Sequence, residues 1–122
     1  MQLAIIAHDG TKDRLRGFIH ANKHIVEKLR ITCTKSTSKI VSEFGIEVDN
    51  VESGPLGGDA QIAAKIVTKE IDAVIFLRDP LGKHPHEPDI YMLLRLCDVY
   101  QVPLATNFKT AEILLKHFNE KL

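Results

Sequence analysis

The sequence has little cysteine, no long apolar run and no excess of charge of either sign. Its 16 lysine and arginine residues balance 16 aspartate and glutamate residues, so the formal net charge is zero at pH 7. Proteins that bind nucleic acids or anionic membranes generally depend on clustered positive charge. The neutral chain, which contains no basic run, therefore predicts neither kind of partner.

The apolar runs, the first residues and the cysteines of the sequence indicate where in the cell to expect the protein. No apolar segment approaches the roughly 20 residues that a membrane-spanning helix needs. The start, MQLAIIAHDG, is too short for a signal peptide and lacks its charged beginning. Cys33 and Cys97 lie far apart and form no CxxC motif, which is typical of free thiols in a reducing compartment. We therefore expect a cytoplasmic protein, and its 122 residues favour one domain, residues 1–122.

What the sequence does contain is a regular alternation of apolar runs and helical patterns. Five runs have the length of strands, at residues 3–7, 30–33, 46–51, 73–77 and 102–105. A helical pattern follows each run, with a break expected near Ala21 and Asn22 in the first and with Gly45 placed to end the second. This order predicts an α/β fold: a three-layer, doubly wound, mainly parallel five-stranded sheet with helices on both faces.

Four of the five expected strands end in loops rich in polar residues or glycine. Their position matters because parallel α/β sheets bind ligands beyond the C-terminal ends of their strands. The first loop holds His8 and Asp9, with Lys12 one helical turn later. Taken alone, these residues favour a structural interpretation, in which Asp9 caps the next helix and Lys12 is solvated.

The second loop, TKSTS at residues 34–38, gathers hydroxyl groups at the expected start of a helix. Hydroxyls and backbone N–H groups at a helix start form a suitable site for a phosphate. An N-cap role for Ser36 or Thr37 is an equally good interpretation of this stretch. The loop lacks the glycines of a Walker-type phosphate loop.

The third loop, SGPLGGD at residues 53–59, has three glycines in five positions. Glycine permits backbone conformations closed to other residues and lets the backbone approach a ligand closely. Asp59 begins the next helix, either as a helix cap or as a general base at the mouth of a site.

The fourth loop, LRDPLGKHPHEPD at residues 77–89, contains three prolines that restrict its conformations. Pro88 also suits the first turn of the helix that follows. The groups that raise the alternative of a metal site are His84, His86, Glu87 and Asp89. We disfavour a metal because no further ligand pattern completes a coordination shell. Instead, His86 and Asp89, three residues apart, suggest a carboxylate that orients an imidazole.

Taken together, these loops resemble those of the methylglyoxal synthase family. The matching pieces are IAHD at 6–9 followed by Lys12, SGPLGGDAQI at 53–62, FLRDPL at 76–81, PHEPD at 85–89, LLRLCDVYQVPLATN at 93–107 and TAEILL at 110–115. The resemblance implies a small doubly wound parallel sheet that converts dihydroxyacetone phosphate into methylglyoxal and inorganic phosphate. It also implies that no metal or organic cofactor takes part, that the chain forms a homohexamer and that free phosphate is both product and candidate inhibitor.

The same resemblance implies a role for each matching residue. Asp59 stands at the catalytic aspartate, which removes a proton from the hydroxymethyl carbon. His86 stands at the histidine that polarises the carbonyl, with Asp89 beside it, and Asp9 and Asp79 match the other active-site carboxylates. The residues that match substrate and phosphate contacts are His8, Lys12, Thr34, Lys35, Ser36, Thr37, Ser53 and Gly54.

The sequence departs from the family at the second loop. The family usually has TGTTG there, so Lys35 and Ser38 replace two glycines. If either glycine position has a positive φ, the replacement strains the loop by about 1 kcal/mol. An arginine that some members carry in a longer C-terminal segment has no match in this sequence, so we expect no such contribution to the phosphate site.

Two alternatives remain at this point. One is a regulatory domain of the same fold, as in carbamoyl phosphate synthetase, which binds an effector without chemistry; the altered second loop favours it, whereas Asp59, His86 and Asp89 favour the enzyme. The other is a signalling receiver domain, with Asp79 as the residue that accepts a phosphoryl group. That scheme needs an acidic pair after the first strand, where this sequence has His8 and Asp9.

Overall fold

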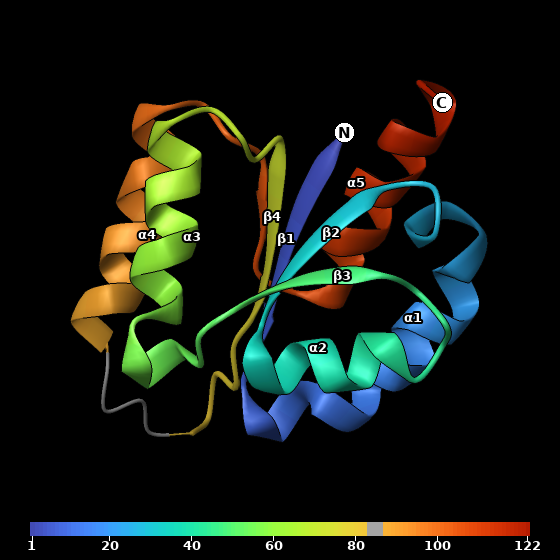
Figure 1. Cartoon of the computed structure of the whole chain (residues 1–122), viewed down its shortest axis with the longest axis horizontal. Helices are drawn as coiled ribbons and strands as arrows, with labels where there is room; N and C mark the ends of the chain where they lie inside the picture. Colours follow the sequence, from blue (N-terminus) through green and yellow to red (C-terminus); the bar gives the residue numbers. More distant parts are fainter. Residues whose placement is uncertain (83–86) are drawn as a thin grey trace.

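The computed structural model describes residues 1–82 and 87–122, apart from the side chains of residues 87–89. Its centre is one sheet with the strand order β3-β2-β1-β4-β5, in which every pairing is parallel (Figure 1). The strands are β1 (Gln2–Ala7), β2 (Arg30–Thr34), β3 (Val48–Val51), β4 (Ala73–Leu77) and β5 (Leu104–Ala105). The helices are α1 (Lys12–Val26), α2 (Lys35–Ser42), α3 (Gly58–Val67), α4 (Glu87–Val99) and α5 (Phe108–Glu120), with short 3-10 helices η1 (Asp9–Thr11) and η2 (Gly54–Leu56).

Helices cover both faces of the sheet, as the sequence predicted. Helices α1, α2 and α5 lie on one face, and α3 and α4 lie on the other (Figure 1). The buried residues form two clusters, one between the sheet and each layer of helices. The strands supply alternate side chains to the two clusters. In β4, for example, Ile75 and Leu77 join one cluster while Val74 and Phe76 join the other. A strand whose two faces are both covered favours apolar residues at nearly every position, which explains the continuous run at residues 73–77.

Of two local predictions about the helices, the break in the first is confirmed and the C-cap of the second is wrong. Asn22 has non-helical angles, φ −115° and ψ 15°, so α1 is broken there. Its side-chain amide donates a hydrogen bond of 2.9 Å to the carbonyl oxygen of Phe18. Gly45 is not the C-cap of α2: the helix ends at Ser42 with Glu43 as its C-cap, and Gly45, with a φ of +74°, ends the turn that follows.

Strand β5 is shorter than expected, because its ladder begins only at Leu104. The amide of Val102 is used by α4, donating a hydrogen bond of 2.8 Å to the carbonyl of Cys97. Pro103 has no amide hydrogen, although its carbonyl accepts from Val74. Strand β3 likewise starts at Val48 instead of Ile46.

The connectivity decides where a ligand site can form. From β1 the chain moves outward through β2 to β3, and then crosses back to β4 on the opposite side of β1. The C-terminal ends of β1 and β4 therefore flank a switch point, where doubly wound sheets open a crevice. None of the described helices has the length and hydropathy to span a membrane.

Candidate active site

A cavity of about 370 Å³ opens at the C-terminal ends of the strands, at the switch point beside β1 and β4. Four segments of the sequence meet around it: the loops after β1, β3 and β4, and the start of α2. Its lining residues are Ile6, Ala7, His8, Asp9, Gly10, Lys12, Thr34, Ser36, Gly54, Pro55, Asp59, Asp79 and Gly82.

The loop after β1 supplies an imidazole and an ion pair. The amide of His8 donates to the carbonyl of Leu77 at 3.0 Å, and the imidazole packs edge-on against Phe76, with ring centroids 5.3 Å apart. The ammonium of Lys12 donates a hydrogen bond to Oδ1 of Asp9. That hydrogen bond, together with the positive charge of Lys12, lowers the pKa of Asp9 below its ordinary value of 3.8.

The structural interpretation of this loop is therefore wrong in both parts. The Asp9 side chain caps neither η1 nor α1, since neither helix start has a side-chain cap hydrogen bond. The side chain of Lys12 is only 16% exposed, whereas that of Asp9 is 98% exposed. Lys12 thus lies partly shielded on the cavity wall, with its ammonium held by Asp9.

The hydroxyl-rich stretch after β2 is mostly the first turn of α2 and not a loop. Thr34 is the N-cap residue and makes no side-chain cap hydrogen bond, so the capping role considered for Ser36 or Thr37 is wrong. Lys35 and Ser38, which replace the family's glycines, both lie within the helix. The described non-glycine residues with a positive φ are Lys69 and Gln101 alone, so the expected strain is absent from this stretch.

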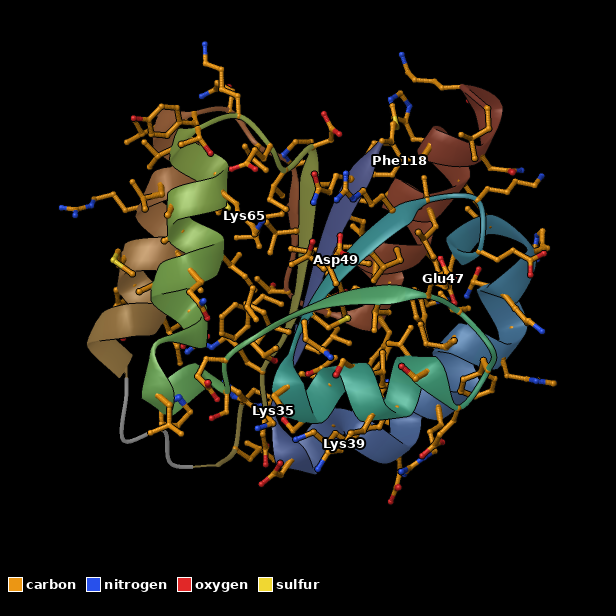
Figure 2. The ribbon with its side chains drawn as sticks, in the orientation of Figure 1. Lys35, Lys39, Glu47, Asp49, Lys65 and Phe118 are labelled. Carbon is orange, nitrogen blue, oxygen red and sulfur yellow. The ribbon has the colours of Figure 1, made fainter. Side chains whose placement is uncertain are left out.

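The side chains of this helix start point in different directions. Thr34 and Ser36 line the cavity. Lys35 is exposed at the start of α2 (Figure 2). Thr37 is fully buried, and neither residue is part of the cavity lining. The hydroxyl oxygen of Thr37 instead accepts a hydrogen bond of 3.1 Å from the amide of Ala7, and it lies 3.1 Å from the hydroxyl oxygen of Thr34.

The glycine-rich loop brings a buried carboxylate to the cavity. Asp59 lies in the first turn of α3 and is only 2% exposed. The N-cap of α3 is Gly57, without a side-chain cap hydrogen bond, so Asp59 is not a helix cap. The backbone of Gly54 passes so close that a Cβ there would lie 3.2 Å from Oδ1 of Asp59. Ser53 does not line the cavity, and its carbonyl closes the turn by accepting from Leu56 and Gly58.

A further carboxylate comes from the loop after β4. Asp79 lines the cavity, and its Oδ1 accepts a hydrogen bond of 3.1 Å from the amide of Leu81. His86 lies outside the described residues. Asp89 is described only in its backbone, in the first turn of α4.

The cavity thus unites eight of the predicted site residues: His8, Asp9, Lys12, Thr34, Ser36, Gly54, Asp59 and Asp79. Lys35, Thr37 and Ser53 adjoin it without lining it. The cavity lining also includes Gly10, Pro55 and Gly82, which were not among the predicted site residues. Gly10 and Pro55 directly follow predicted residues in sequence, and Gly82 lies three residues after Asp79. Within residues 1–82 and 87–122, no group of three or more histidine, cysteine or acidic side chains is arranged to hold a metal ion.

This arrangement combines two chemical capacities. Lys12, the hydroxyls of Thr34 and Ser36 and the start of α2 can hold an anion. Asp59, shielded from solvent, can take a proton from a molecule so held. The cavity is of a size for a small phosphorylated metabolite.

A family model, curated relatives and a solved structure are all similar to this chain. The family model described as MGS-like domain matches residues 17–106. Methylglyoxal synthase of Listeria monocytogenes serotype 4a (strain HCC23) is 52% identical over 117 residues, covering 95% of this chain and 87% of the relative. Methylglyoxal synthase of Thermoanaerobacter pseudethanolicus is 52% identical over 123 residues, covering 100% and 93%. The crystal structure of methylglyoxal synthase from Elizabethkingia anophelis superposes with a TM-score of 0.87 at 38% identity, covering 93% of this chain and 76% of that one.

Proposed function

This chain belongs to the MGS-like domain family, and we propose that it is a phosphate-eliminating lyase that converts dihydroxyacetone phosphate into methylglyoxal and inorganic phosphate. One observation carries the chemistry: a buried carboxylate, Asp59, lines the same small cavity as Lys12 and the start of α2. The relatives named as synthases match almost the whole chain, which favours the enzyme over a regulatory domain.

Substrate binding follows from charge. The substrate is a phosphate dianion near neutral pH, so it needs donors that are held in place. Lys12 supplies a cation, Thr34 and Ser36 supply hydroxyls, and the N-terminus of α2 supplies backbone N–H groups. His8, Ser53 and Gly54 complete the substrate contacts in this proposal, and Lys35 adds positive charge at the rim.

Proton removal is assigned to Asp59. Its carboxylate takes a proton from the hydroxymethyl carbon, and the electron pair of the C–H bond forms the enediolate while negative charge develops on the carbonyl oxygen. Burial keeps bulk water from competing for the base. His86, oriented by Asp89, is proposed to donate to the carbonyl oxygen. Asp9 and Asp79 are the remaining carboxylates of the site.

Phosphate elimination completes the reaction. The remaining hydroxyl of the enediolate gives up its proton and becomes the aldehyde carbonyl, the carbon–carbon double bond shifts toward the carbon that bears the phosphate, and the carbon–oxygen bond to phosphate breaks. Phosphate leaves with the electron pair of that bond, and a proton is returned to the terminal carbon of the resulting enolate, which becomes methylglyoxal. This step requires the breaking bond to stand out of the enediolate plane, so we propose that the donors around Lys12 and Thr34 hold the phosphate in that orientation.

The assembly and location of the chain remain proposals of the same kind. We propose a single-domain chain of residues 1–122 that forms a cytoplasmic homohexamer. Leu81, on the loop after β4, is 96% exposed, and Leu56, in η2, is 74% exposed; both lie near the cavity, which supports subunit contacts there. Light scattering of the purified protein tests the hexamer.

The function is tested by incubating the purified protein with dihydroxyacetone phosphate and measuring both products. We expect methylglyoxal and phosphate in equal amounts, at a rate that a metal chelator leaves unchanged. Phosphate without methylglyoxal would indicate a phosphatase. Binding of dihydroxyacetone phosphate with neither product would indicate the regulatory alternative.

A further inference from the structure

We propose that Gln61 is a positioning residue for this reaction. Its side-chain carbonyl ties the residue before the glycine-rich loop to α3, and it thereby holds the backbone of Gly54 against the carboxylate of Asp59. The inference rests on the function proposed for the cavity, because it concerns how the base assigned there is held beside the substrate.

Gln61 and Asp59 lie near the start of the same helix but face different ways. Neighbouring helix residues differ in direction by about 100°, so residues two positions apart point to nearly opposite sides. Asp59 is 2% exposed and lines the cavity, whereas Gln61 is exposed and does not belong to the cavity lining. A molecule in the cavity therefore meets Asp59 and not Gln61.

The side chain of Gln61 reaches the chain just beyond the end of β3. Pairing of β2 with β3 ends at Thr34 and Val51, so Glu52 lies outside the ladder. The amide of Glu52 donates a hydrogen bond of 2.7 Å to Oε1 of Gln61. This bond joins the residue before the glycine-rich loop to the helix that follows the loop.

The other end of Glu52 is held by close packing. A Cβ at Gly58 would lie 1.9 Å from the carbonyl oxygen of Glu52, so the start of α3 lies directly against it. The next carbonyl, that of Ser53, accepts from the amide of Gly58 at 2.9 Å. The first turns of α3 thus hold the start of the loop twice, through the side chain of Gln61 and through the backbone of Gly58.

The segment held in this way leads directly into the cavity wall. Gly54 follows Ser53, and a Cβ at Gly54 would lie 3.2 Å from Oδ1 of Asp59. Gly54 and Asp59 both line the cavity. Loss of the bond between Gln61 and Glu52 lets the backbone of Gly54 move relative to the carboxylate, and such a shift lowers the rate of a reaction that depends on alignment.

The test compares Gln61→Met, which removes the acceptor from a side chain of similar length, with Gln61→Glu, which keeps a carboxylate oxygen as acceptor. Gln2→Met is the matched control, because it also removes one side-chain hydrogen bond: the Gln2 amide donates to the hydroxyl of Thr32 at 3.1 Å, away from the cavity. For Gln61→Met we expect kcat/KM to fall about 10- to 100-fold, with a lower kcat. Gln61→Glu should restore most of kcat, and Gln2→Met should leave it unchanged.

A loss of kcat in Gln61→Met no larger than in Gln2→Met would overturn the proposal. So would an equal loss of kcat in Gln61→Met and Gln61→Glu, since the acceptor would then be irrelevant. Rates are compared per mole of folded protein, which urea unfolding measures. If Gln61→Met does not fold, Gln61→Ala removes the same acceptor in a residue that favours helices and is judged by the same outcomes.

Substrate deuterated at the hydroxymethyl carbon shows which step has slowed. Asp59 removes a proton from that carbon in the proposed function, so its misplacement slows this step. The primary isotope effect on kcat should therefore be at least as large in Gln61→Met as in the wild type. A lower kcat with a smaller isotope effect than the wild type would overturn the proposal, because a step other than proton removal would then limit turnover.

Hydrogen exchange at the amide of Gly58 tests the link independently of activity. This amide belongs to a buried residue and bonds to the carbonyl of Ser53 inside the loop. We expect it to exchange faster in Gln61→Met than in the wild type, Gln61→Glu or Gln2→Met, and unchanged exchange would overturn the proposal. Absence of methylglyoxal in the wild type would instead count against the proposed function, so the two failures are distinguishable.

Discussion

Lys12 and Asp9 form an ion pair on the cavity wall in which the cation is shielded and the carboxylate faces outward. The pair holds the ammonium of Lys12 at the cavity while leaving it bonded to a group that a substrate phosphate can replace. The pair lowers the pKa of Asp9 below its ordinary value.

Replacement of Lys12 by methionine should raise the pKa of Asp9, because the hydrogen bond and the positive charge that lower it are both removed. Since the folded-state pKa is lowered, the pair stabilises the fold above pH 3.8, and this contribution disappears as the pH falls through the lower, folded-state value. The exposure of Asp9 keeps the contribution small.

Carbon-13 NMR titration of the carboxyl groups measures the pKa of Asp9 directly. Lys39→Met, on the exposed side of α2 (Figure 2), is the control; the same Asp9 pKa in Lys12→Met and wild type would contradict the assignment.

Replacement of Asp59 by asparagine should lower turnover by about 10³-fold or more, because the amide keeps the shape of the side chain but cannot accept the proton. Phosphate binding should be largely retained, since the proposed phosphate donors lie on other elements. Turnover and phosphate affinity are measured separately, with Asp72→Asn as the control; Asp72 accepts from the amide of Gln2 at the other end of the sheet. Wild-type turnover in Asp59→Asn would remove Asp59 from the role of base.

Replacement of Gly58 by alanine should destabilise the protein by about 3 kcal/mol. A Cβ at this position would lie 1.9 Å from the carbonyl oxygen of Glu52, and a backbone atom cannot yield as a flexible side chain can. Gly17→Ala is the matched control: nothing lies within 4 Å of its Cβ position, and it sits in α1, so it should stabilise by about 0.5–1 kcal/mol. Urea denaturation compares the two, and equal stability of the variants would show that the loop after β3 can relax.

Both cysteines should resist thiol reagents in the folded protein. Burial raises the pKa of Cys33 to about 12 and that of Cys97 to about 11, so almost no thiolate exists at pH 8. Disulfide-exchange labelling should therefore proceed only in concentrated urea, where both thiols become exposed. Rapid labelling of the native protein at pH 8 would show that the core around these residues opens.

Much of the fold could be predicted because its core imposes a strong pattern. Residues of β4 alternate between two helix layers, so the run of apolar residues identifies a doubly covered strand. Asn22 marked the break in the first helix, whereas Gly45 marked the end of the turn after α2 and not the helix cap, which is Glu43. The start of α2 was less predictable, because serine and threonine favour loops and helix starts alike.

The candidate site was predictable to the extent that its residues adjoin strand ends. His8, Asp59 and Asp79 follow three different strands, and parallel pairing brings all three to one edge of the sheet. Burial was not predictable in the same way. A helix cap and a buried base are equally consistent with an aspartate at the start of a helix, and only the packing around Gly54 and Asp59 separates them.

The sequence by itself determined the layered fold and the loops that carry chemistry, because apolar periodicity and glycine or proline positions act locally. Only the tertiary structure decided which hydroxyl of α2 faces the cavity and which one bonds to the sheet. Neighbouring helix residues differ in direction by about 100°, so of Ser36 and Thr37 one must turn toward the cavity and the other toward the sheet. The choice depends on the amide of Ala7, which lies far from both in sequence. This amide lies beyond the end of the β1–β2 ladder and donates to the hydroxyl of Thr37 instead of to β2.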